Sequence, residues 1–134
     1  GRSSRFPGQR FPMVTEAIVS DGMVVIAGPA ASPGAVPGGA SPTVSLLGVI
    51  YRPDGSSAAV GDTVDVIISG VYPVIAAGSI TANNLITSGG TDGTAIAESA
   101  GSGVLVGVLG PALEDGVSGD RVATVINPFI KQGA

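Results

Sequence analysis

The sequence contains no cysteine and no histidine. Without cysteine the chain can form neither a disulfide framework nor a thiolate metal site. Without histidine it lacks the commonest general base and the commonest metal ligand of proteins. Serine and threonine are plentiful, but a serine nucleophile needs an activating base, and only Lys131 or a carboxylate could provide one. These absences predict a protein that is not an enzyme and needs no cofactor or metal.

Charged and aromatic residues are also scarce, at 12% and 4% of the chain. The charged share is about half of that in an average soluble protein. A surface so poor in charge predicts that other protein chains cover much of it. No apolar run approaches the ~20 residues of a membrane span, and the polar, basic N-terminus does not resemble a signal peptide. We therefore expect no membrane partner.

The apolar residues that are present favour β-structure. The chain has 18 valines and 11 isoleucines against 6 leucines, together with 22 glycines and 10 prolines. Branching at Cβ suits a pleated strand better than a helix, and glycine and proline mark turns. The 134 residues fit one domain. We predict an all-β fold, a small barrel or sandwich of roughly eight or nine short strands, with an extended N-terminal arm.

Alternating apolar residues and turn signals place the strands. The first two are expected over 13–19 and 23–28, as a hairpin about Ser20-Asp21-Gly22. Further strands are expected over 43–50, 62–69, 71–78, 85–88, 94–98, 103–110 and 121–127. Residues 29–42 contain four prolines and no charge and are predicted to form a long loop. The only helical turn is expected over 111–119, and a short tail over 128–134.

Two details of this pattern can be checked directly. In the strand over 62–69, Val64, Val66 and Ile68 should share one face, because side chains alternate along a strand. Pro73 should lie on an edge strand or at a bulge, because proline cannot donate to a sheet.

Two local clusters invite a binding interpretation that their spacing does not support. Gly101-Ser102-Gly103 lacks the lysine and the helix of a phosphate-binding loop, so we interpret it as a strand turn. Glu114, Asp115 and Asp120 lack the spacing of a calcium loop, so we interpret them as solvated turn acids.

Residues 1–12 differ from the rest and are predicted to form a basic arm ahead of a single domain over 13–134. The arm carries three arginines and no acid, whereas the remaining residues sum to −7. We expect it to bind a protein partner through Arg2, Arg5, Phe6, Arg10 and Phe11. An arm ordered only by its own domain remains an alternative. Nucleic acid is a weaker one, because the negative charge of the domain would repel it.

The stretch from Val60 to Asn127 resembles the capsid cement (decoration) proteins of tailed phages. The resemblance lies in a Gly-Asp turn into a strand that ends in Ser69-Gly70-Val71, and in the run Ile80-Thr81-Ala82-Asn83-Asn84-Leu85. It continues in the Asp92-Gly93 hairpin, the strand Val104–Leu109 and a valine-rich closing strand after Gly119-Asp120. The arm, the loop over 29–42 and the tail lie outside it.

This resemblance implies a β-barrel or sandwich on the outer capsid surface of a virion. Such a protein joins neighbouring subunits of the major capsid protein and stabilises the shell, and many of them are homotrimers. No catalytic residue or cofactor carries over. The alternative is a β-domain binding module, or a head domain of a phage fibre that binds a receptor or carbohydrate. With two tyrosines and three phenylalanines the chain offers few aromatic rings for sugars, which disfavours it.

Overall fold

The computed structural model describes residues 6–28, 34–40, 42, 44–90, 92–99 and 102–132. These residues form an all-β fold, as predicted, with no helix in the part described. The strands are β1 (Phe6–Thr15), β2 (Val24–Ala27), β3 (Gly34–Pro37), β4 (Gly39–Ala40), β5 (Gly48–Tyr51), β6 (Thr63–Ile75), β7 (Ile86–Gly90), β8 (Ala95–Ala97), β9 (Leu105–Val108), β10 (Arg121–Ile126) and β11 (Phe129–Gln132).

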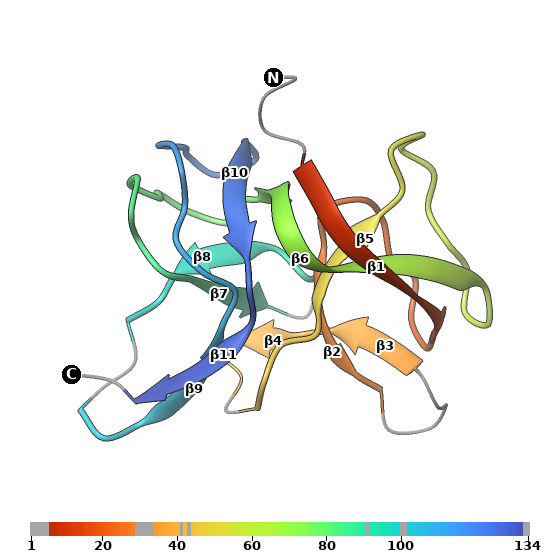
Figure 1. Ribbon diagram of the computed structural model, residues 1–134, viewed down its shortest axis with the longest axis horizontal. Helices are drawn as coiled ribbons and strands as arrows, with labels where there is room; N and C mark the ends of the chain where they lie inside the picture. The colour runs from red at the N-terminus through yellow and green to blue at the C-terminus, as the bar shows by residue number, and fades with distance from the viewer. Residues whose placement is uncertain are drawn as a thin grey trace.

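Five of these strands close into a small barrel. The largest sheet runs in the order β1-β3-β2-β5-β6-β10, and an additional pairing between β1 and β6 closes the first five of these strands into a ring, with β10 outside it. β1 runs antiparallel to β6, whereas it meets β3 in parallel only at Val14 and Thr15. Figure 1 shows these strands on the right, with β6 leading out of the barrel toward β10. Closure removes most of the free sheet edge that an open sheet would expose.

β6 connects the barrel to the rest of the molecule. Its first part pairs with β1 on one side and with β5 on the other, and its last part pairs with β10 from Gly70 to Ile75. Pro73 lies beyond Val71, the last residue of β6 that pairs with β1. The only described strand that pairs with β6 at Pro73 is therefore β10, as expected for proline on an edge. The register there is continuous, so no bulge accompanies it.

Beside the barrel lie two smaller sheets, on the left in Figure 1. One has the order β4-β7-β8, and the other pairs β11 with β9. β7 and β8 form the predicted hairpin, with Ile86 opposite Ala97. Gly93 in its loop has a φ of 73°, in the left-handed region that glycine adopts without steric cost.

The apolar side chains form two cores, one on each face of the barrel wall. Inside the barrel lie Met13, Val19, Val25, Ala35, Ile50, Ala58, Val64 and Val66. Between the barrel and the smaller sheets lie Val24, Leu46, Val49, Ile67, Tyr72, Val74, Ala76, Ile80, Ile86, Ala95, Leu109, Ala112, Val122 and Ile126. Consecutive residues of β2, β5 and β6 thus enter different cores. The predicted faces of β6 are confirmed: Val64 and Val66 point inward with Ile68 against them, and Ile67 points outward.

Several predicted elements are wrong. β1 and β2 do not pair with each other, so the hairpin about Ser20-Asp21-Gly22 does not exist, although Asp21 and Gly22 do form a turn. Residues 111–119 contain no helical turn but short bridges, such as Ile80 opposite Gly116. The loop predicted over 29–42 contains β3 and β4, and the predicted tail contains β11. In each case the backbone of the segment pairs with a part of the chain that is distant in sequence, and local turn signals do not predict such pairing.

The predicted arm is in part a strand of the domain. Residues 6–12 belong to β1 and pair with β6, with register shifts on both sides of Gln9. Residues 1–5 lie outside the described part of the chain. Residues 6–12 of the predicted arm are therefore paired, through their backbone, with the domain.

Candidate functional site

The structure places the five predicted partner-binding residues unequally. Arg2 and Arg5 lie outside the described residues. The backbone of Phe6 pairs with Val71 of β6, but its side chain is not described. Arg10 and Phe11 lie next to each other on β1, where alternation sends their side chains to opposite faces. Only these two can be examined as parts of a site.

Arg10 contacts its own chain on the outer face of the barrel. Its guanidinium lies over the ring of Tyr51, 4.4 Å from the centroid, and 3.9 Å from the Asp65 carboxylate. The side chains of Arg10 and Asp65 are 44% and 45% exposed, so the ion pair contributes about 0–1 kcal/mol. Stacking on Tyr51 at an exposed site contributes about 0.5–1 kcal/mol. Arg10 is thus held weakly enough that a partner's carboxylate could compete for it.

Phe11 is 45% exposed, which is unusual for a phenylalanine in a strand of a closed barrel. It lies opposite Val66 and shares the face of the buried Met13. Gly8, Gln9 and Pro12 are exposed around it. The described part of β1 therefore presents an apolar ring and a weakly held guanidinium to solvent.

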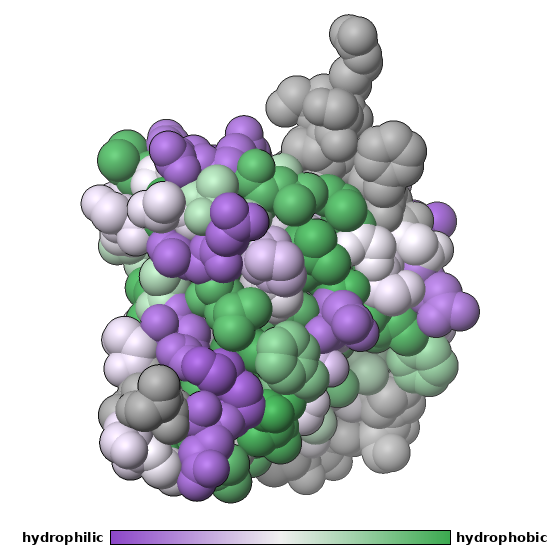
Figure 2. Space-filling view, turned by 60° about the vertical axis from the view of Figure 1, so that its left-hand side comes forward, coloured by the Kyte–Doolittle hydropathy of each residue, from purple (hydrophilic) through white to green (hydrophobic). Residues whose placement is uncertain are grey.

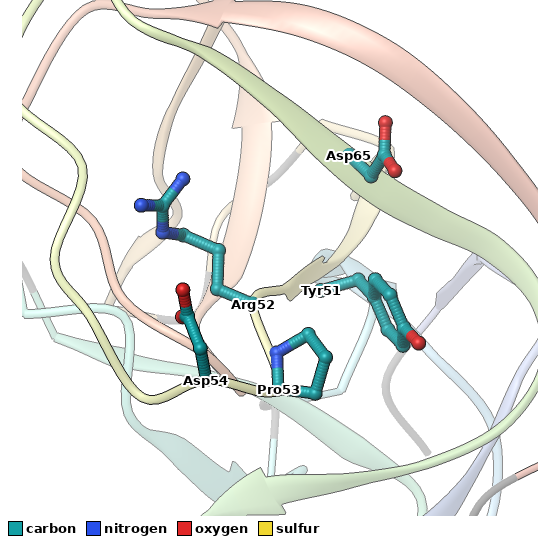
Figure 3. Close-up of a pocket in the computed structure, with 5 residues that line it drawn as sticks. All are labelled: Tyr51, Arg52, Pro53, Asp54 and Asp65. Carbon is teal, nitrogen blue, oxygen red and sulfur yellow. The ribbon is translucent and has the colours of Figure 1, made fainter.

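A shallow pocket opens next to Arg10. It has a volume of about 270 Å³ and is lined by Tyr51, Arg52, Pro53, Asp54 and Asp65 (Figure 3). Hydrogen bonds from the backbone N–H and the hydroxyl of Ser56 lower the pKa of Asp54. Two carboxylates and one arginine around a tyrosine can bind polar or charged groups of a partner.

A buried polar network, which the sequence did not predict, adjoins this pocket at Arg52. The Asp21 side chain is only 3% exposed. It accepts hydrogen bonds from the Arg52 backbone N–H at 2.7 Å, the Tyr72 hydroxyl at 2.8 Å and Arg121 Nη1 at 2.9 Å. Asp21 therefore fixes the turn before β2 against β5, β6 and β10, which is a structural role. Its turn was visible in the sequence, but its partners were not.

Exposed apolar residues gather at the β9–β11 sheet. We call Val44, Val104, Leu105, Phe129 and Ile130, which are all 41–51% exposed, the β9–β11 patch. Ile130 lies opposite Gly107, so it shares a face with Leu105, two residues before Gly107 on β9. The Val44 carbonyl lies against the same side of Gly107, where a Cβ would be. Figure 2 brings this side of the molecule forward and shows apolar areas between polar ones.

Neither a metal centre nor a membrane-spanning helix is found among the described residues. Within them, no three acidic side chains lie close enough together to hold a metal ion. No helix in this part of the chain has the length and apolar character needed to cross a membrane. Glu114, Asp115 and Asp120 instead accept backbone hydrogen bonds from Ala123, Ala82 and Val117, respectively.

Comparison with known proteins finds a structural neighbour but no sequence relative. No family model matches the chain, and no curated protein matches it. Among solved structures, the chain is similar to the head fiber gp8.5 N base of bacteriophage phi29, with a TM-score of 0.60 and 20% sequence identity. The alignment covers 89% of this chain and 93% of the other. At this identity the likeness shows the fold, and it covers almost the whole of both chains.

Proposed function

We propose that the chain is a non-enzymatic structural protein of a tailed-phage head, which binds the outer surface of the capsid. The observation that carries the proposal is the fold. Nearly the whole chain aligns with the N base of the phi29 head fiber. The resemblance of Val60–Asn127 to cement proteins, found independently in the sequence, points to the same location.

Within this role we favour a cement function, in which each copy bridges neighbouring subunits of the major capsid protein. The surface supports it: charged residues are 12% of the chain, and large apolar side chains are exposed on several sides. A protein that contacts a lattice through many weak contacts gains overall affinity from their repetition. We place the capsid contact on β1, where Phe11 is 45% exposed and Arg10, on the opposite face, is weakly held.

The second candidate is the base domain of a head fibre, which the phi29 comparison favours specifically. Both candidates predict attachment to the capsid, but they differ in what the attached domain does. A cement protein spans two or more capsid subunits, whereas a fibre base binds at one place and projects a shaft or receptor-binding part away from the shell.

Binding to capsids tests the shared part of the proposal. Expanded empty shells of the major capsid protein encoded with this chain should co-sediment with the purified chain. A reconstruction of the decorated shell then distinguishes a bridging density from a projecting one. Failure to co-sediment at any subunit ratio would overturn both candidates.

A pair of variants locates the contact. Phe11→Ala removes an apolar ring of β1 that is 45% exposed, whereas Ile18→Ala removes a side chain that is 65% exposed outside β1. Burial of a whole phenylalanine contributes about 1.5–3 kcal/mol. Phe11→Ala should therefore weaken shell binding about tenfold. Ile18→Ala should leave it unchanged, and equal effects of the two variants would exclude β1 as the contact.

A further inference from the structure

β11 is a sheet edge that carries few of the features that block pairing with another chain. It pairs with β9 on one side, and no described strand lies on its other side. Phe129–Gln132 contains no proline, and the charge of Lys131 is matched by Glu98, 2.6 Å from its Nζ. Natural sheets protect exposed edges with prolines and charges, because unpaired N–H and C=O groups recruit other strands.

The outer edge of β1 gives the contrast within the same molecule. Beyond its two-residue pairing with β3, β1 also has no described strand on the side away from β6. That edge carries Pro7 and Pro12 together with Arg10, all within the same strand. Proline removes the N–H that an added strand would need. The β1 edge therefore has prolines that block the addition of a strand, whereas β11 itself has none.

The side chains around β11 also favour burial. Ile130 and Leu105 are 47% and 50% exposed and lie on one face, and Phe129, which is 41% exposed, lies on the other. Full burial of one aliphatic or phenylalanine side chain corresponds to about 60–150 Å² of apolar surface, so the exposed halves of the five side chains of the β9–β11 patch amount to at most about 400 Å² on each copy. Patches of this size are often functional in soluble proteins.

We propose that β11 is a self-association edge, which pairs antiparallel with β11 of a second copy about a twofold axis at Ile130. A twofold contact requires only that the same patch be complementary to itself. With this register, Ile130 lies opposite Ile130 of the second copy, and Phe129 lies opposite Lys131. Isoleucine then meets isoleucine on one face, while an aromatic ring meets a lysine stem and ammonium on the other.

Charge and the position of Pro128 favour this register, and charge also favours a second copy of the chain as the partner. A register centred on Lys131 would place two ammonium groups directly opposite each other, which is destabilising. The register centred on Ile130 leaves Pro128, which has no N–H, opposite Gln132 at the ends of the paired segment, whereas a register centred on Phe129 would bring Pro128 opposite Ile130, next to the centre. Because Lys131 is already matched by Glu98, the interface as a whole carries no net charge. Two copies that each carry −4 can therefore approach through this neutral, apolar edge.

The size of the contact sets its strength. Pairing at the β11 edge covers only part of the two patches and therefore buries less than about 800 Å² in total, below the ~1,200 Å² of standard stable interfaces. The dimer should therefore be weak in dilute solution and become populated at high concentration or when a surface holds copies together. A twofold contact gives a dimer instead of the homotrimer expected from the sequence. It does not depend on the capsid proposal and can be tested on the isolated protein.

The absence of cysteine makes a crosslinking test clean. In antiparallel sheets, directly opposite residues have Cβ atoms ~4.5–5.5 Å apart, close to the distance that a disulfide spans. Under mild oxidation, the Ile130→Cys variant should form a covalent dimer at least tenfold faster than the Ile18→Cys variant. Ile18 is the matched control, because it is 65% exposed and lies outside β9 and β11. Equal crosslinking rates would overturn the proposal.

Sedimentation of the cysteine-free chain provides the second measurement. The wild-type chain should shift from monomer to dimer as its concentration rises toward the millimolar range. Ile130→Glu should abolish this shift, and Ile18→Glu should leave it unchanged, with circular dichroism used to check that both variants fold. A trimer, a wild-type chain that stays monomeric throughout, or a dimer that Ile130→Glu does not affect would each contradict the proposed edge.

Discussion

Replacement of Asp21 by alanine tests whether the buried carboxylate holds the two parts of the fold together. The Asp21 side chain is 3% exposed and accepts hydrogen bonds from Arg52, Tyr72 and Arg121. In Asp21→Ala, the Arg52 N–H and the Tyr72 hydroxyl lose this acceptor where water has little access, at about 1–3 kcal/mol each. Arg121 is 44% exposed and regains water, so its loss adds only about 0–1 kcal/mol. The expected decrease in the free energy of unfolding is about 3–5 kcal/mol.

Tyr72→Phe is the matched control, because it removes one oxygen and leaves the carboxylate with its other two donors. Loss of a single hydrogen bond at this position should cost about 1 kcal/mol. Urea unfolding followed by far-ultraviolet circular dichroism measures both variants, with an unchanged m-value as evidence that the same cooperative unit unfolds. The prediction is therefore a large effect at Asp21 and a small one at Tyr72.

Two results would refute this reasoning. If Asp21→Ala costs less than about 1 kcal/mol, the network is not a significant source of stability. If Tyr72→Phe costs as much as Asp21→Ala, the energy belongs to the hydroxyl and the carboxylate is only one of its acceptors.

Three further predictions concern close packing, a turn and the N-terminal strand. Gly107→Ala should destabilise the fold by about 1–3 kcal/mol, because the new Cβ overlaps a backbone carbonyl, whereas Gly78→Ala, with nothing within 4 Å, should be nearly neutral in the same urea assay. The Thr94 hydroxyl and backbone N–H lower the pKa of Asp92, so Thr94→Val should raise that pKa in a carboxyl NMR titration. A carboxyl group whose pKa is lowered by folding stabilises the fold at pH values above its pKa in the unfolded chain. This stabilisation is lost as the pH falls through the pKa of the folded state, so the wild-type chain should lose more stability than the variant below about pH 4. Removal of residues 1–12 should prevent cooperative folding, whereas a truncation that stops before β1 should leave the circular dichroism spectrum intact, and a folded 1–12 deletion would show that β1 is dispensable.

The sequence determined the class of fold and the orientation of individual side chains. An excess of β-branched residues with glycine- and proline-rich turns predicted an all-β protein, which is confirmed. The alternation in β6 predicted that Val64 and Val66 share a face, and the hairpin of β7 and β8 followed from its turn residues. These features are local, because successive side chains on any strand point to opposite faces and a tight turn fixes its own geometry.

Tertiary structure decided which strands pair and what the polar side chains contact. Asp21 is bonded to groups that are 31, 51 and 100 residues away in sequence, so no local pattern could have predicted its burial. Arg10 was predicted to bind a partner, and only the structure shows that Asp65 and Tyr51 of the same chain lie beside it. The segment predicted as a short tail contains β11, which is a strand only because β9 pairs with one of its sides. Pairing of this kind depends on the closure of long loops by the whole domain, which a single segment of sequence does not specify.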